Sequence, residues 1–361
     1  MLMTIHDHSV IAPLLNRKAI NLEQLYYSDG RRLEGRAQPG NGKVMVISSD
    51  LSKSTQIYLT AIELFAQMEI CYKVLSKVLG NEDAEHFNAV MEELVCKLSH
   101  IAEHHFDLAY AYMSWHASDD YPVMHHLIVA LTLARIGQMS GRFEKAYLHS
   151  LMKAALTMNL SMLALQARLR SQTEPLSREQ KEAIRKHPER SFNKLQLLGV
   201  TDPVWLETVQ LHHELPDGSG YPLQIKNQDE GSVLLGICDS FNARMALREY
   251  RTNFTAEQAV QDLFAQGNNL VSDFASLLLE GLGIYPPGSL VQLEGNLIAC
   301  SLLRGQSAVS PVVLAFRNLP ASSQHFMLVD SDQDGYAVKN SLPRRDQGKM
   351  PPLLELLSKV A

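Results

Sequence analysis

Residues 212–222 read HHELPDGSGYP, and this stretch decides how the rest of the chain is interpreted. Two adjacent histidines and an acid stand directly before a turn that holds too much glycine to be helical. Neutral imidazoles and carboxylates are the usual protein ligands of first-row transition metals. Adjacent residues of a helix point about 100° apart, so His212 and His213 would serve neighbouring ions, or one would bind while the other packs. The stretch therefore predicts part of a metal site beside a glycine-rich turn.

Length and composition describe an ordinary globular protein with room for about two domains. The chain has 361 residues, of which 46% are hydrophobic and 20% are charged. A net charge of −6 gives no electrostatic reason to expect a nucleic-acid polymer as partner. The N-terminal residues lack a signal-peptide pattern, and no uncharged apolar run approaches the ~18 residues of a membrane span. We therefore expect a cytoplasmic protein, whose four cysteines form no CxxC pair and are expected to be buried thiols.

The pattern of apolar residues divides the chain into four parts. Residues 1–50 are poorly patterned and include the loop-like run SDGRRLEGRAQPGNGK. Residues 51–117 carry two apolar stripes at alternating spacings of four and three, which predict a helical hairpin and fit a homodimer interface equally well. Residues 284–361 hold apolar strands separated by turns, closed by a short helix near 351–360. Between these parts, residues 118–283 predict consecutive helices at 123–140, 143–168, 177–197, 203–213, 231–248, 256–264 and 270–281.

Further candidate ligands lie in the helical part of the chain. Asp239 follows an apolar run on a predicted helix, where a lone acid would be costly to bury without a partner. His187 stands at the head of a helical turn in RKHPERSF, and His125 opens the first helix in YPVMHHLIVALTLA. A single histidine packs more often than it binds a metal. Several histidines in one helical domain favour a shared site.

The segment HHELPDGSGYP, with CDSFNARMALREYR downstream and DDYPVMHHLIVA upstream, resembles the HD-GYP family. This family is the all-helical branch of the HD metallohydrolases that opens the bacterial second messenger cyclic di-GMP to pGpG and GMP. The resemblance covers about residues 118–305, whereas residues 1–117 match no input domain that we can name. It implies a mainly α fold, in which an all-helical HD-type domain follows the helical hairpin and precedes the small β-rich extension.

The resemblance also implies roles for particular residues. It implies a metal-ligand set of His125, His187, His212, His213 and Asp239. It implies that the signature loop beside the dinucleotide consists of Asp217, Gly218, Gly220, Tyr221 and Pro222, with Ser219 between them. Arg248 and Arg251 match basic residues that meet the ligand's phosphate and guanine, a role that suits guanidinium. In this family the signature loop is also implicated in contacts with diguanylate-cyclase domains, which makes such a protein a candidate partner.

One segment departs from the family pattern. The pair that names the family should stand in a stretch resembling AALLHDIGK, and here that stretch is AALTMNLSM. We predict that Thr157 and Met158 replace the histidine and the aspartate, and that Ser161 replaces the following lysine. In addition, Tyr121 stands where an acid is expected, and Pro216 stands where a tryptophan usually precedes the DG of the signature. Without the bridging aspartate, two close cations would have too little negative charge between them.

These departures favour a degenerate HD-GYP protein that binds cyclic di-GMP or a signalling partner with little or no hydrolysis. No catalytic residue is assigned in this interpretation. Three or four histidines and one acid could still hold a single divalent ion such as Fe or Mn. The alternative is an active metal-dependent phosphodiesterase with a reduced metal site, releasing pGpG or GMP. A third hypothesis is an interaction scaffold in which the histidines only pack.

Overall fold

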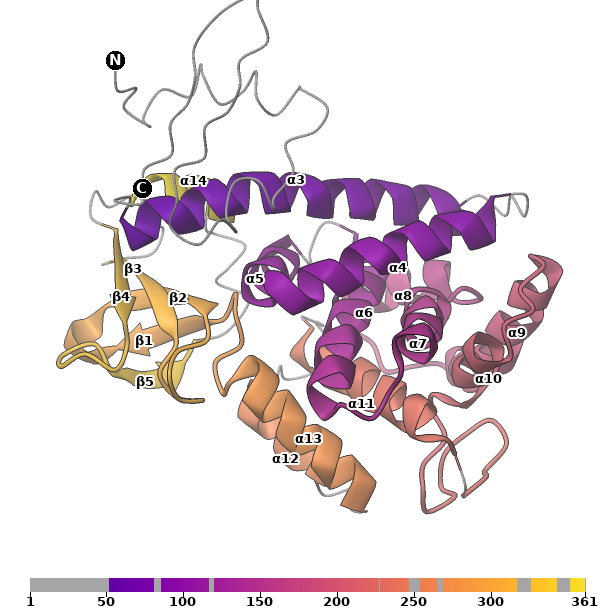
Figure 1. The fold of residues 1–361 in the computed structure, drawn as a ribbon. Coiled ribbons are helices and arrows are strands. Elements are labelled where there is room, and N and C mark those ends of the chain that lie inside the picture. Colours follow the sequence, from indigo (N-terminus) through magenta and orange to yellow (C-terminus); the bar gives the residue numbers. More distant parts are fainter. Residues whose placement is uncertain are drawn as a thin grey trace, which may run out of the picture.

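The computed structural model of the protein describes residues 52–80, 86–116, 120–226, 228–246, 254–264, 269–316, 326–342 and 351–360. Within these ranges the fold is mainly helical, with one small sheet near the C-terminus (Figure 1). This confirms the predicted fold class, an all-helical domain followed by a small β-rich extension. The poorly patterned segment 1–50 lies outside the described residues.

Three helices replace the two helices expected between residues 51 and 117. They are α3 (Lys53–Gly80), α4 (Phe87–His104) and α5 (Phe106–His116). The second apolar stripe is interrupted because the backbone leaves helical geometry at His105, where φ is −136° and ψ is 23°. Both α4 and α5 pack against the next helix, α6 (Tyr121–Ser140). The apolar stripes therefore join the core of the helical domain that follows them.

Helix α6 is the central element of the helical domain. Its residues are buried on nearly every side from Tyr121 to Ala134, as expected for a helix that is apolar all round. It contacts α4 and α5, which precede it in the chain, and four of the helices that follow it, α7, α8, α11 and α13. The bounds of the remaining helices of this domain are α7 (Lys145–Thr157), α8 (Leu163–Ser171), α9 (Arg178–Leu197), α10 (Pro203–Leu211), α11 (Glu230–Met245), α12 (Ala256–Phe264) and α13 (Asn269–Leu282).

The predicted helix over 143–168 is wrong in one respect, because the structure divides it into α7 and α8. Between them the backbone N–H of Asn159 donates to His126 Nε2 at 3.4 Å, and that of Ser161 donates to Ser191 Oγ at 3.1 Å. Polar side chains from α6 and α9 thus accept N–H groups that would otherwise continue the helical ladder. The resulting turn over 158–162 lies beside the candidate site.

Short polar residues determine where the site helices begin. Ser177 and Gln180 form a capping box at the start of α9. Asp202 accepts a hydrogen bond from the Trp205 N–H at the start of α10, where Pro203 occupies the first turn. Asp229 caps α11 in the same way through the Ser232 N–H. These caps are local sequence features, so they place α9, α10 and α11 along the chain before any tertiary contact forms.

The C-terminal extension is one antiparallel sheet in the order β4-β3-β2-β1-β5. Its strands are β1 (Leu290–Leu293), β2 (Ile298–Leu303), β3 (Val312–Phe316), β4 (Met327–Asp330) and β5 (Val338–Ser341). Leu290 lies opposite Cys300, and Cys300 opposite Leu314, so one face of the sheet joins the main core. The last helix, α14 (Leu353–Ser358), returns to pack on α3 (Figure 1).

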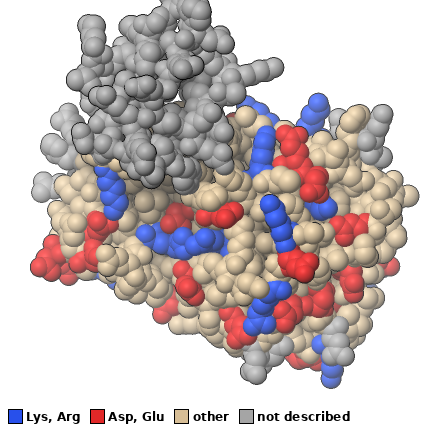
Figure 2. Space-filling model, in the orientation of Figure 1, with Lys and Arg blue, Asp and Glu red and all other residues tan. Residues whose placement is uncertain are grey.

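The surface carries charges of both signs. Figure 2 shows Lys and Arg side chains lying among Asp and Glu side chains over the part of this face that the structure describes. Such mixing gives no single-sign area on that face for steering a polyanion. Among the described helices, none combines the length and the apolar character that crossing a membrane would need.

Candidate functional site

The structure brings all five predicted ligands together between four helices. His125 lies on α6, His187 on α9, and Asp239 on α11, while His212 ends α10 and His213 follows it. His125 Nε2 is 2.7 Å from Asp239 Oδ1, and His213 Nε2 is 3.9 Å from Asp239 Oδ2. The ligand atoms of His187, His212 and His213 lie within 4.8 Å of one another. We call these five residues the histidine cluster.

Two backbone carbonyls determine which nitrogens of the cluster face inward. His187 Nδ1 donates to the Ile184 carbonyl at 2.6 Å, and His212 Nδ1 donates to the Val209 carbonyl at 2.7 Å. Each ring therefore keeps a bare lone pair on Nε2, and the two Nε2 atoms are 3.2 Å apart. Two lone pairs at this distance repel unless a cation or a proton lies between them. A carbonyl on the outer nitrogen is the usual support of a metal-binding imidazole, so the arrangement fits a metal ion.

Burial sets the protonation states of the cluster. It lowers the pKa of His187 to about 3, and it lowers the pKa values of His212 and His213 as well. The three imidazoles are therefore neutral near pH 7, which is the form that binds a metal. Burial alone would raise the pKa of Asp239, but the hydrogen bond and charge of His125 lower it below its usual range. Asp239 is therefore the ionised carboxylate of the site.

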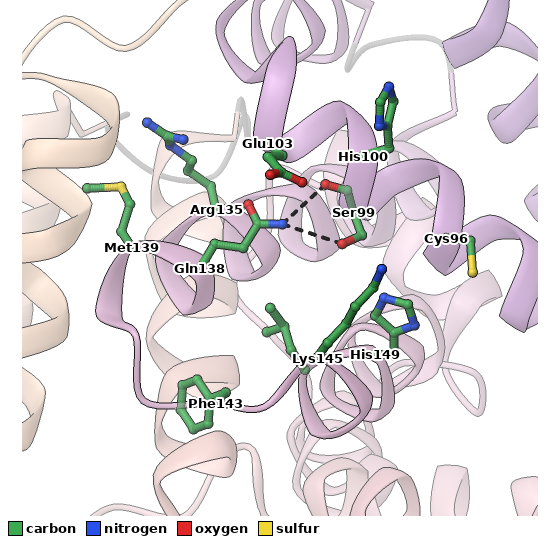
Figure 3. A pocket seen from close by; sticks show the side chains of 11 residues that line it. Cys96, Ser99, His100, Glu103, Arg135, Gln138, Met139, Phe143, Lys145 and His149 are labelled. Carbon is green, nitrogen blue, oxygen red and sulfur yellow. Dashed lines mark hydrogen bonds between the residues drawn. The ribbon is translucent and has the colours of Figure 1, made fainter.

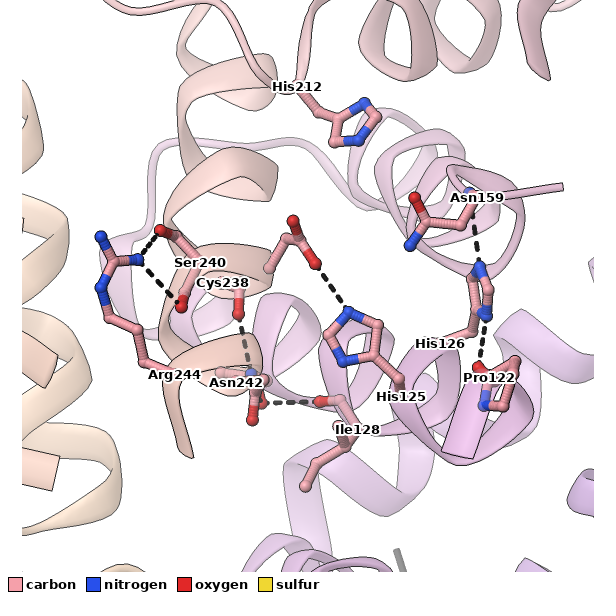
Figure 4. Close-up of polar contacts among 12 residues, drawn as sticks. Pro122, His125, His126, Ile128, Asn159, His212, Cys238, Ser240, Asn242 and Arg244 are labelled. Carbon is pink, nitrogen blue, oxygen red and sulfur yellow. Dashed lines mark hydrogen bonds and ion pairs between the residues drawn. The ribbon is translucent and has the colours of Figure 1, made fainter. Parts of the chain in front are cut away.

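His126 is adjacent to His125 in the sequence but has a packing role. Its Nδ1 donates to the Pro122 carbonyl at 2.6 Å, and its Nε2 accepts the Asn159 N–H at 3.4 Å (Figure 4). Burial lowers the pKa of His126 to about 3. Both ring nitrogens are thus occupied by the backbone, and the residue anchors the turn between α7 and α8.

The predicted position of the family's histidine–aspartate pair needs a correction of one residue. Compared letter by letter, AALTMNLSM places Met158 opposite the histidine of AALLHDIGK and Asn159 opposite the aspartate. The lysine then corresponds to Met162, whereas Ser161 donates its hydroxyl to the His187 carbonyl at 3.0 Å. Thr157 is occupied elsewhere, because its hydroxyl accepts from Trp205 Nε1 and donates to the Lys153 carbonyl, both at 2.8 Å.

Asn159 is the site residue that sequence reasoning missed. It is 2% exposed, and its side-chain Oδ1 has no hydrogen-bond partner among the described residues. A buried carbonyl oxygen without a donor is costly, and a cation would satisfy it. Figure 4 shows the Asn159 amide beside His126, on the side of the cluster where His212 lies. Met158, by contrast, is fully buried in the apolar core. A letter-by-letter alignment of AALTMNLSM with AALLHDIGK would have identified Asn159 from the sequence alone.

A buried glutamate holds the segment that follows the signature loop. The carboxylate of Glu214, which is 5% exposed, accepts the backbone N–H groups of three consecutive residues, Leu223, Gln224 and Ile225. The last two bonds are 3.0 and 3.2 Å long. Three donors on one carboxylate are the strong, charge-assisted kind of hydrogen bond. Glu214 therefore closes residues 214–225 into one compact loop.

The signature loop lies directly against the histidine cluster. The Tyr221 N–H donates to the His213 carbonyl at 3.1 Å, and the two rings stack with centroids 4.7 Å apart. A Cβ atom on Gly220 would lie within 2.6 Å of backbone atoms of residues 213–215, so only glycine fits there. Gly218 has a φ of +80°, and the Asp217 carboxylate accepts the Ser219 N–H at 2.8 Å on the exposed side. The loop therefore presents Tyr221 to the cluster and Asp217 to solvent.

The remaining positions named from the family resemblance are Tyr121, Pro222, Arg248 and Arg251. The Tyr121 ring, which stands where the family has an acid, lies 5.4 Å from the His125 ring between centroids. Pro222 follows Tyr221 in the loop and is half-buried. Arg248 and Arg251, the predicted basic contacts of the dinucleotide, lie outside the described residues.

Comparisons with known proteins show which family the chain matches and which proteins it resembles. Residues 89–273, just over half of the chain, match the family described as HD domain. A cyclic di-GMP phosphodiesterase of Pseudomonas aeruginosa is 25% identical over 204 residues, which are 55% of this chain and 49% of that protein. The cyclic di-GMP phosphodiesterase PdeB of Borreliella burgdorferi is 23% identical over 187 residues, which are 50% of this chain and 48% of that protein. The chain thus spans about half the length of these two relatives.

The chain also resembles a third phosphodiesterase over a shorter stretch, and one solved structure in its fold. The 3'3'-cGAMP-specific phosphodiesterase 2 of Vibrio cholerae is 38% identical over 77 residues, which are 20% of this chain and 15% of that protein. An HDG"Y"P protein from Bdellovibrio bacteriovorus aligns with a TM-score of 0.51 and 17% identity, over 63% of this chain and 74% of that one. This last likeness concerns the fold alone.

Proposed function

The chain belongs to the HD domain family, on its HD-GYP branch, and from this premise we propose that it binds cyclic di-GMP with little or no hydrolysis. Two of the similar proteins carry the name cyclic di-GMP phosphodiesterase. The observation that carries the proposal is the replacement of the family's histidine–aspartate pair by the neutral side chains of Met158 and Asn159. An amide can neither bridge two cations as a carboxylate does nor accept a proton at neutral pH.

We propose that the cluster holds one divalent transition metal ion, Fe or Mn. The inward nitrogens of His187, His212 and His213 would hold it, with Asp239 as the nearby charge. Support comes from the facing Nε2 atoms, which a cation between them would satisfy, and from Asn159 Oδ1, which is buried without a hydrogen-bond partner among the described residues. One carboxylate balances only part of one divalent charge, so a second close cation would be poorly held. When bound, the ion would supply positive charge toward a phosphate of the ligand.

The chain's own residues account for binding without efficient turnover. Tyr221 is held against His213 by a backbone hydrogen bond and is available to lie beside a base or phosphate of the dinucleotide. Nothing in this contact depends on Met158 or Asn159. Hydrolysis depends on stabilising charge in the transition state, and losing one such interaction costs about 10²–10³-fold in rate. Loss of both members of the pair therefore lowers turnover far more than binding.

An active phosphodiesterase with a reduced metal site is the second candidate. The observation that favours it is the persistence of three neutral imidazoles whose inward nitrogens already face one another. In that case one ion would suffice for slow hydrolysis to pGpG or GMP. The two candidates differ in turnover and agree on ligand binding, so activity decides between them.

The test measures cyclic di-GMP affinity by calorimetry and pGpG and GMP release by chromatography on the same preparations. We expect the wild type to bind without measurable turnover, and Met158→His/Asn159→Asp to gain activity. Thr157→His/Met158→Asp is the matched control, because it places the same side chains one residue earlier and removes the Trp205 hydrogen bond. It should gain nothing.

Three results would contradict the proposal. Brisk wild-type turnover that disappears in His212→Ala would establish the active phosphodiesterase instead. Failure of well-folded wild type to bind cyclic di-GMP would remove the binding function. Metal analysis that finds two or more Fe or Mn ions per chain would refute the single-ion site, since both ions would have to be held without the bridging aspartate.

A further inference from the structure

A second group of metal-ligating side chains lies between α4 and α7, outside the histidine cluster. Glu92 and Cys96 are one turn apart on α4 and therefore lie on the same helix face. His149 on α7 packs opposite them. Glu92 Oε1 is 3.9 Å from Cys96 Sγ and 3.5 Å from His149 Nδ1, and the three ligand atoms lie within 4.8 Å of one another.

His149 is a buried imidazole whose hydrogen-bonding capacity is largely unused. The residue is only 8% exposed, and its Nε2 has no hydrogen-bond partner among the described residues. Its Nδ1 is the nitrogen that faces Glu92, 3.5 Å from Oε1. This contact is too long for a strong hydrogen bond, so Nδ1 is the nitrogen that could bind an ion shared with Glu92.

Lys153 orients the carboxylate of Glu92 by binding one of its two oxygens. Its ammonium group is 3.2 Å from Glu92 Oε2 and leaves Oε1 directed at Cys96 and His149. Lys153 is itself held by Asp202 at 3.4 Å. Metal-binding carboxylates are oriented by a hydrogen bond of this kind on their second oxygen.

We infer that Glu92, Cys96 and His149 form a second metal site that takes a thiolate-binding divalent ion of the zinc class. Thiolate sulfur, imidazole nitrogen and carboxylate oxygen are all ligand types that zinc accepts, with bond lengths of about 2.0–2.3 Å. Neighbouring ligand atoms of a tetrahedral ion with such bonds are about 3.3–3.8 Å apart. The contacts of Glu92 Oε1 to the other two ligands already fall close to this range. The ligand atoms of Cys96 and His149, which lie within 4.8 Å of each other, would have to move closer together on binding.

The fourth coordination position of this ion opens toward solvent. Cys96 and His149 lie on the wall of a cavity of about 470 Å³ between α4, α6 and α7, which Figure 3 shows from close by. Arg135 and Lys145 line the same cavity. An ion would therefore have an entry path and would keep one position for water or a small anion. It would also join α4, where the HD domain match begins, to the helix that leads into the Asn159 turn.

The experiment uses Co²⁺ as the probe, with the full chain kept reduced by a phosphine. A thiolate bound to Co²⁺ gives an intense near-ultraviolet charge-transfer absorption that histidine and carboxylate ligands do not give. We expect this absorption in the wild type, its displacement by Zn²⁺, and its complete loss in Cys96→Ala. Glu92→Gln should weaken the Co²⁺ affinity by at least about tenfold. Both side chains are exposed, so neither variant removes core packing.

The matched control is His212→Ala, which removes a ligand of the histidine cluster and should leave the thiolate absorption unchanged. The control separates this site from the proposed function, whose failure would not affect the Co²⁺–thiolate signal. The inference is overturned if the wild type shows no thiolate absorption at saturating Co²⁺. It is equally overturned if the absorption persists in Cys96→Ala, because it would then come from another thiol such as Cys238, which adjoins Asp239.

Discussion

Replacing Glu214 with alanine tests whether one buried carboxylate holds the loop that carries Tyr221. The carboxylate accepts the N–H groups of Leu223, Gln224 and Ile225, and hydrogen bonds to a charged group contribute about 1.5–3 kcal/mol each. At the lower end, three such bonds amount to about 4.5 kcal/mol. Leu223 is 53% exposed, so water can reach part of the segment and replace some of the lost acceptors. We therefore expect Glu214→Ala to lower the free energy of unfolding by about 3 kcal/mol.

The assay is urea unfolding followed by circular dichroism, combined with cyclic di-GMP affinity as a readout of the loop. Glu214→Gln should lose about half as much stability, because its amide oxygen can still accept from Leu223 and Gln224 while its NH₂ group faces the Ile225 N–H. Glu182→Ala is the control, since this exposed residue forms its ion pair with Lys186 one turn away on the surface. A loss below about 1 kcal/mol in Glu214→Ala would refute the reasoning, because the three hydrogen bonds would then contribute almost nothing to stability.

Three further predictions concern the site and the stability of the fold. Thr157→Val should lower the free energy of unfolding by about 1–3 kcal/mol in urea, since it leaves the buried indole N–H of Trp205 without an acceptor. Thr157→Ser should be nearly neutral, and equal losses in the two variants would contradict the assigned hydrogen bond. Gly220→Ala should weaken cyclic di-GMP binding more than Ser219→Ala, because its Cβ would collide with the backbone of residues 213–215; wild-type affinity would contradict the close approach. Burial raises the pKa of Glu63 from 4.5 to about 7. Between these two pH values the folded state retains a proton that the unfolded chain releases, so the free energy of unfolding falls as the pH rises from 4.5 to about 7. Glu63→Gln should therefore flatten the pH dependence of the unfolding free energy and exceed the wild type in stability at pH 8, and an unchanged wild-type slope would exclude Glu63 as its source.

The sequence was sufficient for the fold class and for the members of the histidine cluster. Helical stripes and strand–turn patterns are local properties, because side chains repeat with the period of the backbone geometry. The motif around His212 and His213 is likewise contiguous, and the caps at Asp202 and Asp229 mark helix starts within a few residues. Information of this kind is complete before the chain folds, so it could be read without coordinates.

Roles that depend on distant partners could not be read in this way. The break between α7 and α8 exists because His126 and Ser191, far away along the chain, accept the N–H groups of Asn159 and Ser161. Periodicity could not reveal it, since apolar residues continue through the turn. The same contact makes His126 a packing residue while its neighbour His125 pairs with Asp239.

By itself, then, the sequence determined which side chains the protein has for chemistry and on which elements they lie. The tertiary structure decided what each of them faces. It directed the Nε2 atoms of His187 and His212 at each other through carbonyls of their own helices, and it left the Asn159 oxygen without a partner within the described part of the chain. It also brought His149 to Glu92 and Cys96 from a different helix. The physical reason is that ligand sites and hydrogen-bond satisfaction depend on distances of a few ångströms between helices, which packing alone sets.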